Sequence, residues 1–209
     1  MEKIKIGVLV SGGGTNLQAI IEAVEAGKIP DSKIALVISN REDVFALQRA
    51  RQHEIEAITI KSKGVPCEEY SKKISEELEK REVNLVCLAG FLLKLSSEFV
   101  QRFKGRILNV HPALLPAFGG QGMYGHHLHE AVVASGAKFS GTTVHFVDES
   151  YDTGPIILQA VVPVLDDDTP ETLAARILKE EHRIYPEAIK LFAEGKLLVE
   201  GRRVRIKRG

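Results

Sequence analysis

Short apolar runs and helical patterns alternate along the first half of the chain. Runs typical of strands that are covered on both faces occupy residues 4–10, 34–39, 55–60, 85–89 and 107–110. Between them, apolar residues recur at three- and four-residue spacing, which predicts helices over residues 16–26, 44–52, 67–80 and 96–103. This alternation favours a parallel sheet with right-handed crossovers. We therefore expect an α/β fold with a Rossmann-like, doubly wound and mostly parallel sheet.

The pattern changes after residue 110. A long stretch rich in proline and glycine, residues 111–126, predicts a functional loop. The elements expected after it are helices near 129–134 and over 170–192, strands over 142–147 and 156–164, a solvated turn over 166–169 that leads into an N-cap at Thr169, and a terminal hairpin that turns at Glu200 and Gly201. We expect one domain over residues 1–209, in which a mixed C-terminal half extends the sheet.

Composition and charge narrow the class of protein. The 209 residues are 44% hydrophobic and 27% charged, as in an ordinary soluble globular protein. Lys+Arg and Asp+Glu are both 28, so the neutral chain gives no electrostatic reason to expect nucleic acid or an anionic membrane as partner. No apolar run approaches the roughly 20 residues of a membrane span, and the two cysteines have no metal-site spacing. We expect a cytoplasmic protein.

Three glycines, residues 12–14, join the first predicted strand to the first predicted helix. At such a junction, backbone N–H groups and the helix dipole favour an anion. A dinucleotide fingerprint would need a third glycine where Leu17 stands, and an acidic residue near the end of the second strand, which is missing. A single phosphate is favoured, with Thr15 and Asn16 as further donors; a capped turn without a ligand is the alternative.

The segment "LNVHP" ends the fifth predicted strand with Asn109 and His111. Ligand chemistry in open α/β sheets gathers at this edge, and alternate residues of an extended segment point to the same side. A carboxamide beside an imidazole can stabilise an oxyanion and move a proton. A capped strand end, with His111 bonded to backbone, is equally open.

The segment "FVDESYDTGP" supplies three acids, Asp148, Glu149 and Asp152. A carboxylate that pairs with His111 would raise the pKa of that histidine. From the residues alone, a solvated acidic turn is the favoured interpretation.

Two further stretches are weaker candidates. In "GHHLHE", His126, His127 and His129 suggest zinc, but no cysteine or acid stands at a matching spacing, so we expect no metal. In "AGFLLKL", residues 89–95, an aromatic heterocycle could pack against apolar side chains, with plain core as the alternative.

These segments in this order resemble one family. The stretches "SGGGTNLQAI", "LAGF", "LNVHPALLPAF", "GTTVHFVD", "DTGPIILQ" and "EHRIYP" are together similar to phosphoribosylglycinamide formyltransferases, over essentially the whole chain. The resemblance implies direct transfer of a formyl group from 10-formyltetrahydrofolate, a co-substrate, to the amine of glycinamide ribonucleotide in de novo purine biosynthesis. It implies no metal, no nucleic acid and no membrane, and a monomer or homodimer.

The resemblance also implies roles for single residues. Asn109 and His111 would stabilise the oxyanion of a tetrahedral intermediate, with His111 also a proton donor, and Asp152 would tune His111 and move protons. The ribonucleotide would bind Gly13, Gly14, Thr15, Asn16 and Glu181. The folate would bind Leu92, Leu93, Lys94, Leu95, Asn109, Asp148 and Asp152. Residues 1–110 would thus form the half that binds the ribonucleotide phosphate, and residues 111–209 the half with the folate and catalytic loops.

The chain departs from the family pattern at two places. Members often carry an arginine in the pterin-strand motif and another near the folate tail, where this chain has Leu93 and Cys67; the stretch after "LLPAF" is slightly longer here. Two other hypotheses stay open: a related folate enzyme that formylates another amine, and a phosphate-binding module without catalysis.

Overall fold

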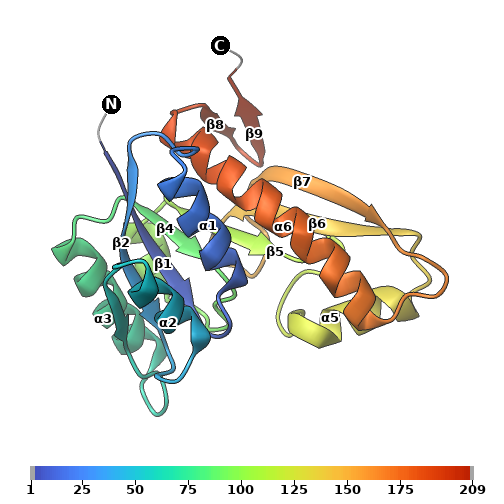
Figure 1. Ribbon diagram of the computed structural model, residues 1–209, viewed down its shortest axis with the longest axis horizontal. Helices are drawn as coiled ribbons and strands as arrows, with labels where there is room; N and C mark the ends of the chain where they lie inside the picture. The colour runs from blue at the N-terminus through green and yellow to red at the C-terminus, as the bar shows by residue number, and fades with distance from the viewer. Residues whose placement is uncertain (1–2, 208–209) are drawn as a thin grey trace. The chain divides into compact units, whose positions relative to one another are not determined.

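The computed structural model describes residues 3–207 and divides the chain into two compact units, Met1–Asn109 and Val110–Gly209. Figure 1 labels the elements of both units.

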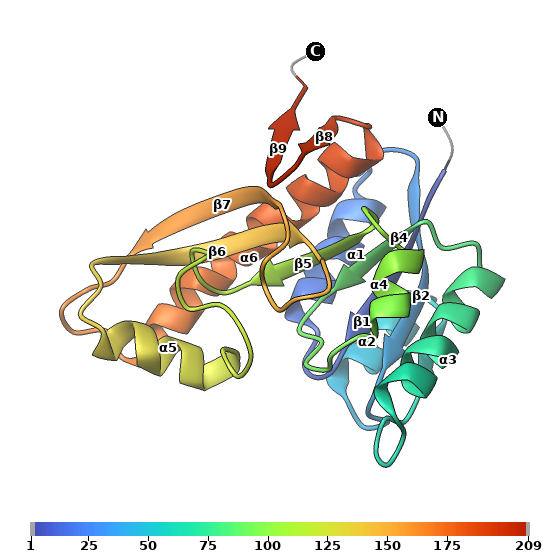
Figure 2. The ribbon, with the colours of Figure 1, turned by 180° about the vertical axis from the view of Figure 1, so that it is seen from behind.

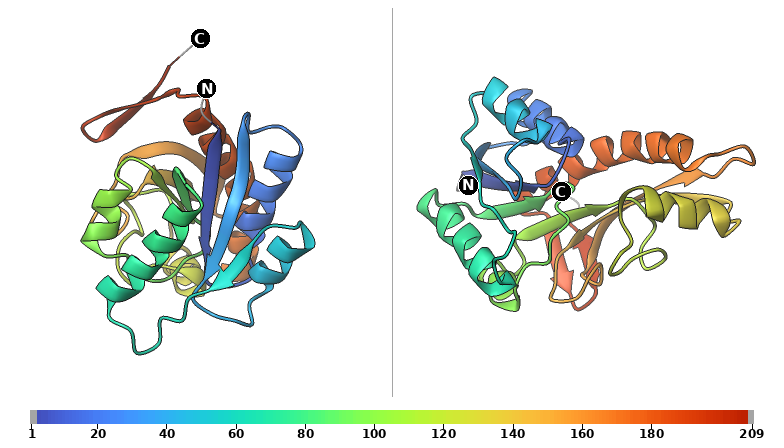
Figure 3. Two further views of the ribbon diagram at one scale, coloured as in Figure 1. Left: turned by 90° about the vertical axis from the view of Figure 1, so that its left-hand side faces the viewer. Right: turned by 90° about the horizontal axis from the view of Figure 1, so that it is seen from below.

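The first unit is built around parallel strands. Its elements, in chain order, are β1 (Ile4–Val10), α1 (Thr15–Glu25), β2 (Ser32–Ser39), α2 (Phe45–Gln52), β3 (Ala57–Thr59), α3 (Cys67–Lys80), β4 (Leu85–Leu88), α4 (Ser97–Arg102) and β5 (Ile107–His111), whose end enters the second unit. The strands lie in the order β3-β2-β1-β4-β5, and each neighbouring pair is parallel. In the left view of Figure 3, α1 and α2 cover one face of the sheet and α3 and α4 cover the other. This is the doubly wound arrangement that the alternating pattern predicts.

The apolar runs of the first unit are buried because helices cover both faces of the sheet. Val8, Leu9 and Leu85 have no exposed surface. Gly7 lies where a side chain on β1 would collide with Leu78 of α3, so the strand and the helix approach closely there.

The second unit combines antiparallel strands with a long helix. Its elements are α5 (Gly125–Ala134), β6 (Phe139–Phe146), β7 (Ile156–Pro163), α6 (Pro170–Ala193), β8 (Leu197–Glu200) and β9 (Arg203–Ile206). β6 and β7 pair antiparallel, β8 and β9 form the predicted hairpin, and β9 pairs with β7 at Ile156 and Arg203. α6 runs along β6 and β7 (Figure 1), and the view from the opposite side has these strands in front of it (Figure 2). Mixed strands thus follow the parallel sheet, as expected.

The structure corrects two local predictions in the second unit. The sequence predicts a loop up to residue 126 and a helix near residues 129–134, whereas α5 begins at Gly125. Asp168, expected in a solvated turn, has a side chain only 3% exposed and accepts hydrogen bonds from Arg176, at 2.6 Å from Nη1 to Oδ2. The guanidinium of Arg176 holds the pKa of Asp168 well below its usual range. The N-cap at Thr169 is confirmed, because its hydroxyl accepts from the backbone N–H of Thr172.

Candidate active site

His111 ends β5 and is buried. Its Nε2 lies 2.8 Å from the backbone oxygen of Phe118, an oxygen that can only accept, so Nε2 carries the proton of this hydrogen bond. The backbone oxygen of His111 accepts from the hydroxyl of Thr142 over 3.0 Å. The neutral imidazole is therefore the Nε2–H tautomer, and Nδ1 lies on the side of the ring away from Phe118.

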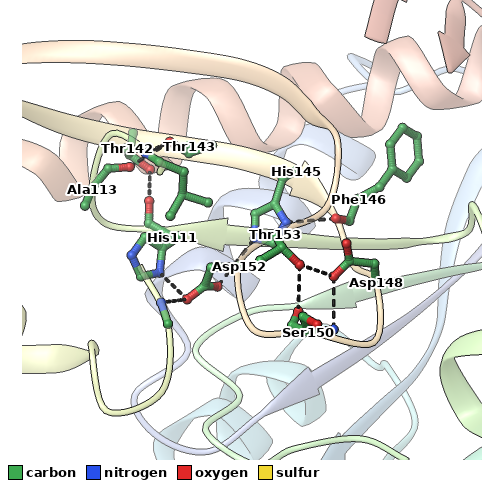
Figure 4. A network of polar contacts seen from close by, with 12 residues as sticks. His111, Ala113, Thr142, Thr143, His145, Phe146, Asp148, Ser150, Asp152 and Thr153 are labelled. Carbon is green, nitrogen blue, oxygen red and sulfur yellow. Dashed lines mark hydrogen bonds and ion pairs between the residues drawn. The ribbon is translucent and has the colours of Figure 1, made fainter. Parts of the chain in front are cut away.

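Nδ1 of His111 faces the carboxylate of Asp152, which lies between two histidines (Figure 4). Oδ2 of Asp152 is 3.6 Å from Nδ1 of His111, and Oδ1 is 3.7 Å from Nε2 of His145. The backbone N–H of Gly120 donates to Oδ2 over 2.9 Å. The Asp152 side chain is 13% exposed, so it is not part of a solvated turn. The structure brings His111 and Asp152 together, as the resemblance implies.

His145 is a site residue that the sequence interpretation missed. It lies on β6 with 1% of its surface exposed, and its Nδ1 donates to the backbone oxygen of Phe146 over 2.8 Å. That bond directs the opposite ring nitrogen, Nε2, toward Asp152. The signal was available: a histidine within the buried strand "GTTVHF" needs a polar partner.

Two threonines of β6 hold the segment that follows His111. Besides the bond from Thr142, the hydroxyl of Thr143 donates to the backbone oxygen of Ala113 over 2.7 Å and accepts from the N–H of Leu115 over 3.0 Å. These buried bonds make β6 the support of the loop that carries Phe118 and Gly120.

Burial and charge set the protonation of the pair. Burial lowers the pKa of His111 below its ordinary value, although the charge of Asp152 and the bond to Phe118 act in the opposite direction. Burial alone would raise the pKa of Asp152, but the two histidines and the Gly120 N–H together outweigh it and lower that pKa. The Asp152 carboxylate therefore raises the His111 pKa, as expected, but the net shift of that pKa is downward because desolvation of the imidazolium exceeds the attraction of the carboxylate. At neutral pH the pair is a neutral imidazole beside a carboxylate.

The substitution Asp152→Asn is expected to lower the pKa of His111 further. The carboxylate is the largest contribution that raises this pKa, and the amide removes its charge. NMR titration of the ring signals, assigned with His111→Asn, measures the shift, and Glu149→Gln in the same turn serves as control. An unchanged or raised His111 pKa in Asp152→Asn would contradict the electrostatic coupling.

The other predicted residues of the catalytic and folate sets lie as follows. Asn109 is half-buried in β5, two positions before His111. Asp148 accepts from the N–H of Ser150 over 3.1 Å and from the hydroxyl of Thr153 over 2.7 Å, so it shapes the loop that carries Asp152. Glu181 is 8% exposed on α6.

The glycine loop, residues 11–14, joins β1 to α1 in the first unit. Gly14 is the N-cap of α1 with φ +73°, and a Cβ there would lie 2.6 Å from Cβ of Ala46 on α2. At Gly12 and Gly13 a Cβ would meet nothing within 4 Å. Packing therefore explains Gly14 alone, and the surface above the other two glycines has room for a ligand. Thr15 and Asn16 begin α1, where N–H groups favour an anion.

Arg49 of α2 holds the glycine loop, a contact that no motif or spacing in the sequence predicts. Its Nε donates to the backbone oxygen of Gly13 over 2.9 Å, and its guanidinium lies over the ring of Phe45 at 4.7 Å. The bond fixes the peptide between Gly13 and Gly14, and the cation lies beside the loop that is expected to bind phosphate.

The loop that is expected to hold the pterin ring, residues 90–96 and called the pterin loop below, follows β4. Leu92 and Lys94 are exposed, Leu93 is half-buried and Leu95 is buried. Sγ of Cys67 donates to the backbone oxygen of Lys94 over 3.3 Å. Cys67 therefore contacts the backbone of this loop.

The histidines of α5 pair with acids. His126 contacts Glu130 at 3.1 Å and Glu171 at 3.4 Å, and His127 contacts Glu130 at 3.2 Å. His129 is buried, and burial lowers its pKa. Within residues 3–207, no group of three or more histidine, cysteine or acidic side chains could hold a metal ion. Over the same range, no helix is both long and apolar enough to cross a bilayer.

Comparison with known proteins gives consistent matches. A family model described as Formyl transferase matches residues 4–189. The phosphoribosylglycinamide formyltransferase of Haemophilus influenzae (strain ATCC 51907 / DSM 11121 / KW20 / Rd) is 44% identical over 194 residues, which are 92% of this chain and 89% of that protein. The chloroplastic enzyme of that name from Vigna unguiculata is 45% identical over 195 residues, and this chain spans 62% of its length.

Solved structures agree. Glycinamide ribonucleotide transformylase 1 from Symbiobacterium toebii superposes with a TM-score of 0.92 at 49% identity, covering 98% of this chain and 94% of that chain. Because the family model covers most of the sequence and these relatives match over nearly all of it, the chain belongs to the formyl transferase family.

Proposed function

We propose that this chain transfers the formyl group of 10-formyltetrahydrofolate to the amine of glycinamide ribonucleotide, a step of de novo purine biosynthesis. The observation that carries the proposal is the likeness, over nearly the whole chain, to enzymes that bear the name of this reaction. The His111–Asp152 pair supports it, because formyl transfer needs a proton donor and a proton acceptor at one place.

The reaction is a direct acyl transfer. The ribonucleotide amine attacks the formyl carbon, and the carbonyl oxygen becomes an oxyanion in a tetrahedral intermediate. The carboxamide of Asn109 and the imidazole of His111 stabilise that oxyanion; one such donor is worth roughly 3–4 kcal/mol. The intermediate collapses with cleavage of the bond to N10 of the folate. The proton lost by the amine equals the proton gained by N10, so tetrahydrofolate leaves neutral at that atom.

The protonation states of His111 and Asp152 suit these proton movements. Asp152 is ionised and able to accept a proton, directly or through water, since its pKa is lowered. His111 carries its proton on Nε2, which donates to Phe118 in the structure. Exchange of the Phe118 oxygen for the substrate oxygen makes this N–H the oxyanion donor. The amine proton that Asp152 accepts can pass to Nδ1 of His111, and the carboxylate, ionised again, then stabilises the imidazolium that forms.

Binding is assigned to both halves of the chain. Residues 1–110 bind the ribonucleotide phosphate at Gly13, Gly14, Thr15 and Asn16 and also carry the pterin loop, and residues 111–209 carry the catalytic loop and further folate contacts. The Glu181 carboxylate holds the glycinamide end, since a carboxylate pairs with an amine. The folate lies against Leu92, Leu93, Lys94 and Leu95, with Asn109, Asp148 and Asp152 as further contacts. A cytoplasmic location and a monomer or homodimer complete the proposal.

A formyl-transfer assay tests the proposal. Purified chain is mixed with glycinamide ribonucleotide and 10-formyltetrahydrofolate, and the formation of tetrahydrofolate is followed. Turnover that depends on both substrates is expected. Turnover with another amine alone would identify a related formyltransferase, and turnover with water alone a hydrolase. Folded chain that shows no turnover at all would overturn the proposal.

A further inference from the structure

Ser11 connects the glycine loop to the pterin loop within the first unit. It is the residue between β1 and the three glycines, and 5% of its surface is exposed. The backbone N–H of Leu92 donates to Oγ of Ser11 over 3.1 Å, across 81 positions of sequence. Ser11 is not among the binding residues that are expected from the sequence.

This bond continues the pairing of β1 and β4 beyond the ends of the strands. The parallel ladder runs up to Leu9 opposite Leu88, and the N–H of Ala89 donates to the oxygen of Leu9 over 2.9 Å. Beyond that point β1 and β4 continue into separate loops. The Ser11 side chain takes the place of the next backbone acceptor and joins the loops at their base, where it is shielded from water.

Each loop is also held by a helix on its own side. Arg49 of α2 holds the oxygen of Gly13 in the glycine loop. On the pterin loop, Cys67 of α3 holds the oxygen of Lys94, and the hydroxyl of Ser71 accepts from the N–H of Ser96 over 2.9 Å. The loops are thus supported separately by α2 and α3, and Ser11 ties one loop to the other.

We propose that Ser11 is a positioning residue that couples ribonucleotide binding to folate binding. The inference rests on the proposed function, which assigns phosphate to the glycine loop and the pterin ring to the backbone after Leu92. Phosphate bound by the loop N–H groups orders the peptides next to Ser11. Ser11 then holds the Leu92 N–H, and with it the Leu92 and Leu93 backbone, in the geometry that takes the pterin ring. Such coupling is reciprocal: each ligand tightens the other by the same factor.

Calorimetric titration of the full chain tests the coupling. The dissociation constant of tetrahydrofolate, which cannot transfer a formyl group, is measured with and without saturating glycinamide ribonucleotide. We expect the ribonucleotide to tighten tetrahydrofolate binding about 5-fold or more in the wild-type chain. Ser11→Ala, which lacks the acceptor, should reduce the factor to about 1, and Ser11→Thr, which keeps it, should restore it. In turnover, Ser11→Ala should raise KM for the folate and leave kcat within about 2-fold.

A matched control variant and a measurement on the wild-type chain make the test of the coupling independent of Ser11→Ala alone. Ser39→Ala removes a buried hydroxyl at the end of β2 that accepts from the N–H of Arg41 over 3.0 Å, and it should leave the coupling unchanged. In the wild-type chain, the ribonucleotide alone should slow hydrogen exchange of the Leu92 amide, which needs no substitution.

The outcomes separate the coupling from the activity. The role of Ser11 is overturned, and the proposed function left intact, if the wild-type chain transfers formyl groups and either of two results is found. One is full coupling in Ser11→Ala; the other is hydrogen exchange of the Leu92 amide that the ribonucleotide does not slow in the wild-type chain. A wild-type chain that binds neither ligand overturns both.

Discussion

Asparagine in place of Asp152 is expected to lower kcat for formyl transfer by about 100-fold or more, the usual contribution of a positioned proton-transfer group. The carboxylate lies 3.6 Å from His111 and 3.7 Å from His145 and carries the negative charge of the cluster. Without it, the proton of the attacking amine loses its acceptor, and an imidazolium at His111 loses its counter-ion. The dissociation constant of the ribonucleotide, measured by calorimetry, should change by less than about 3-fold, since its phosphate is assigned to the glycine loop.

Asparagine is the appropriate replacement because it preserves the local backbone. Asp152 has φ +55°, a left-handed conformation that asparagine adopts more readily than other residues with a side chain. The amide oxygen can still accept from the N–H of Gly120, so only the charge is removed. Glu149→Gln, an exposed acid of the same turn, should keep wild-type kcat. Equal losses in both variants would mean that the turn, not the Asp152 charge, matters.

A loss of kcat is also expected when either proposed oxyanion donor, Asn109 or His111, is removed. Asn109→Ala and His111→Ala should each lower kcat by roughly 100- to 1000-fold, with the ribonucleotide still bound. Rates like those of the wild-type chain in these two variants and in Asp152→Asn would refute the assignment of the site.

The fold could be predicted where the periodicity was strong. β1 and α3 have the bounds that the sequence predicts, because a short, mostly apolar run favours a strand and a four-residue apolar spacing favours a helix. α5 could not be placed as well. It begins at Gly125 with φ +59° and has no side-chain cap, so its start carries no local signal. What stabilises this helix is tertiary: Leu128 and Val132 pack against Leu173 and Ile177 of α6.

The site could be predicted in part, because motif order identifies residues but not their contacts. Spacing suggested that Asn109 and His111 act together, and resemblance singled out Asp152 from three acids. The positions of His145 and of the Phe118 oxygen depend on β6 and on a loop that turns back onto His111, over separations that no spacing rule covers. The direction of the His111 pKa also depends on burial, which a sequence does not state.

Gly14→Ala is expected to destabilise the chain by about 3 kcal/mol. A left-handed alanine costs roughly 1–2 kcal/mol, and overpacking adds about 1–3 kcal/mol. Gly14 has φ +73°, and its new Cβ would lie 2.6 Å from Cβ and 2.8 Å from Cα of Ala46. The backbone of Ala46 also donates to the oxygen of Gly12 over 3.2 Å, so α2 cannot move away without loss of that bond. Denaturant unfolding measures the free energy change.

Gly13→Ala is the matched control, because the two glycines serve different ends. A Cβ at Gly13 meets nothing within 4 Å, so the free energy of unfolding should change by less than about 0.5 kcal/mol. The same methyl group would occupy the space assigned to the ribonucleotide phosphate, and the dissociation constant of the ribonucleotide should rise about 10-fold or more, the effect of one lost charge-assisted contact. A stable Gly13→Ala chain that binds the ribonucleotide normally would contradict the phosphate site. A Gly14→Ala chain as stable as the wild type would show that α2 moves away from the loop at little cost. Together the two substitutions separate the glycine that the fold requires from the glycine that a phosphate would require.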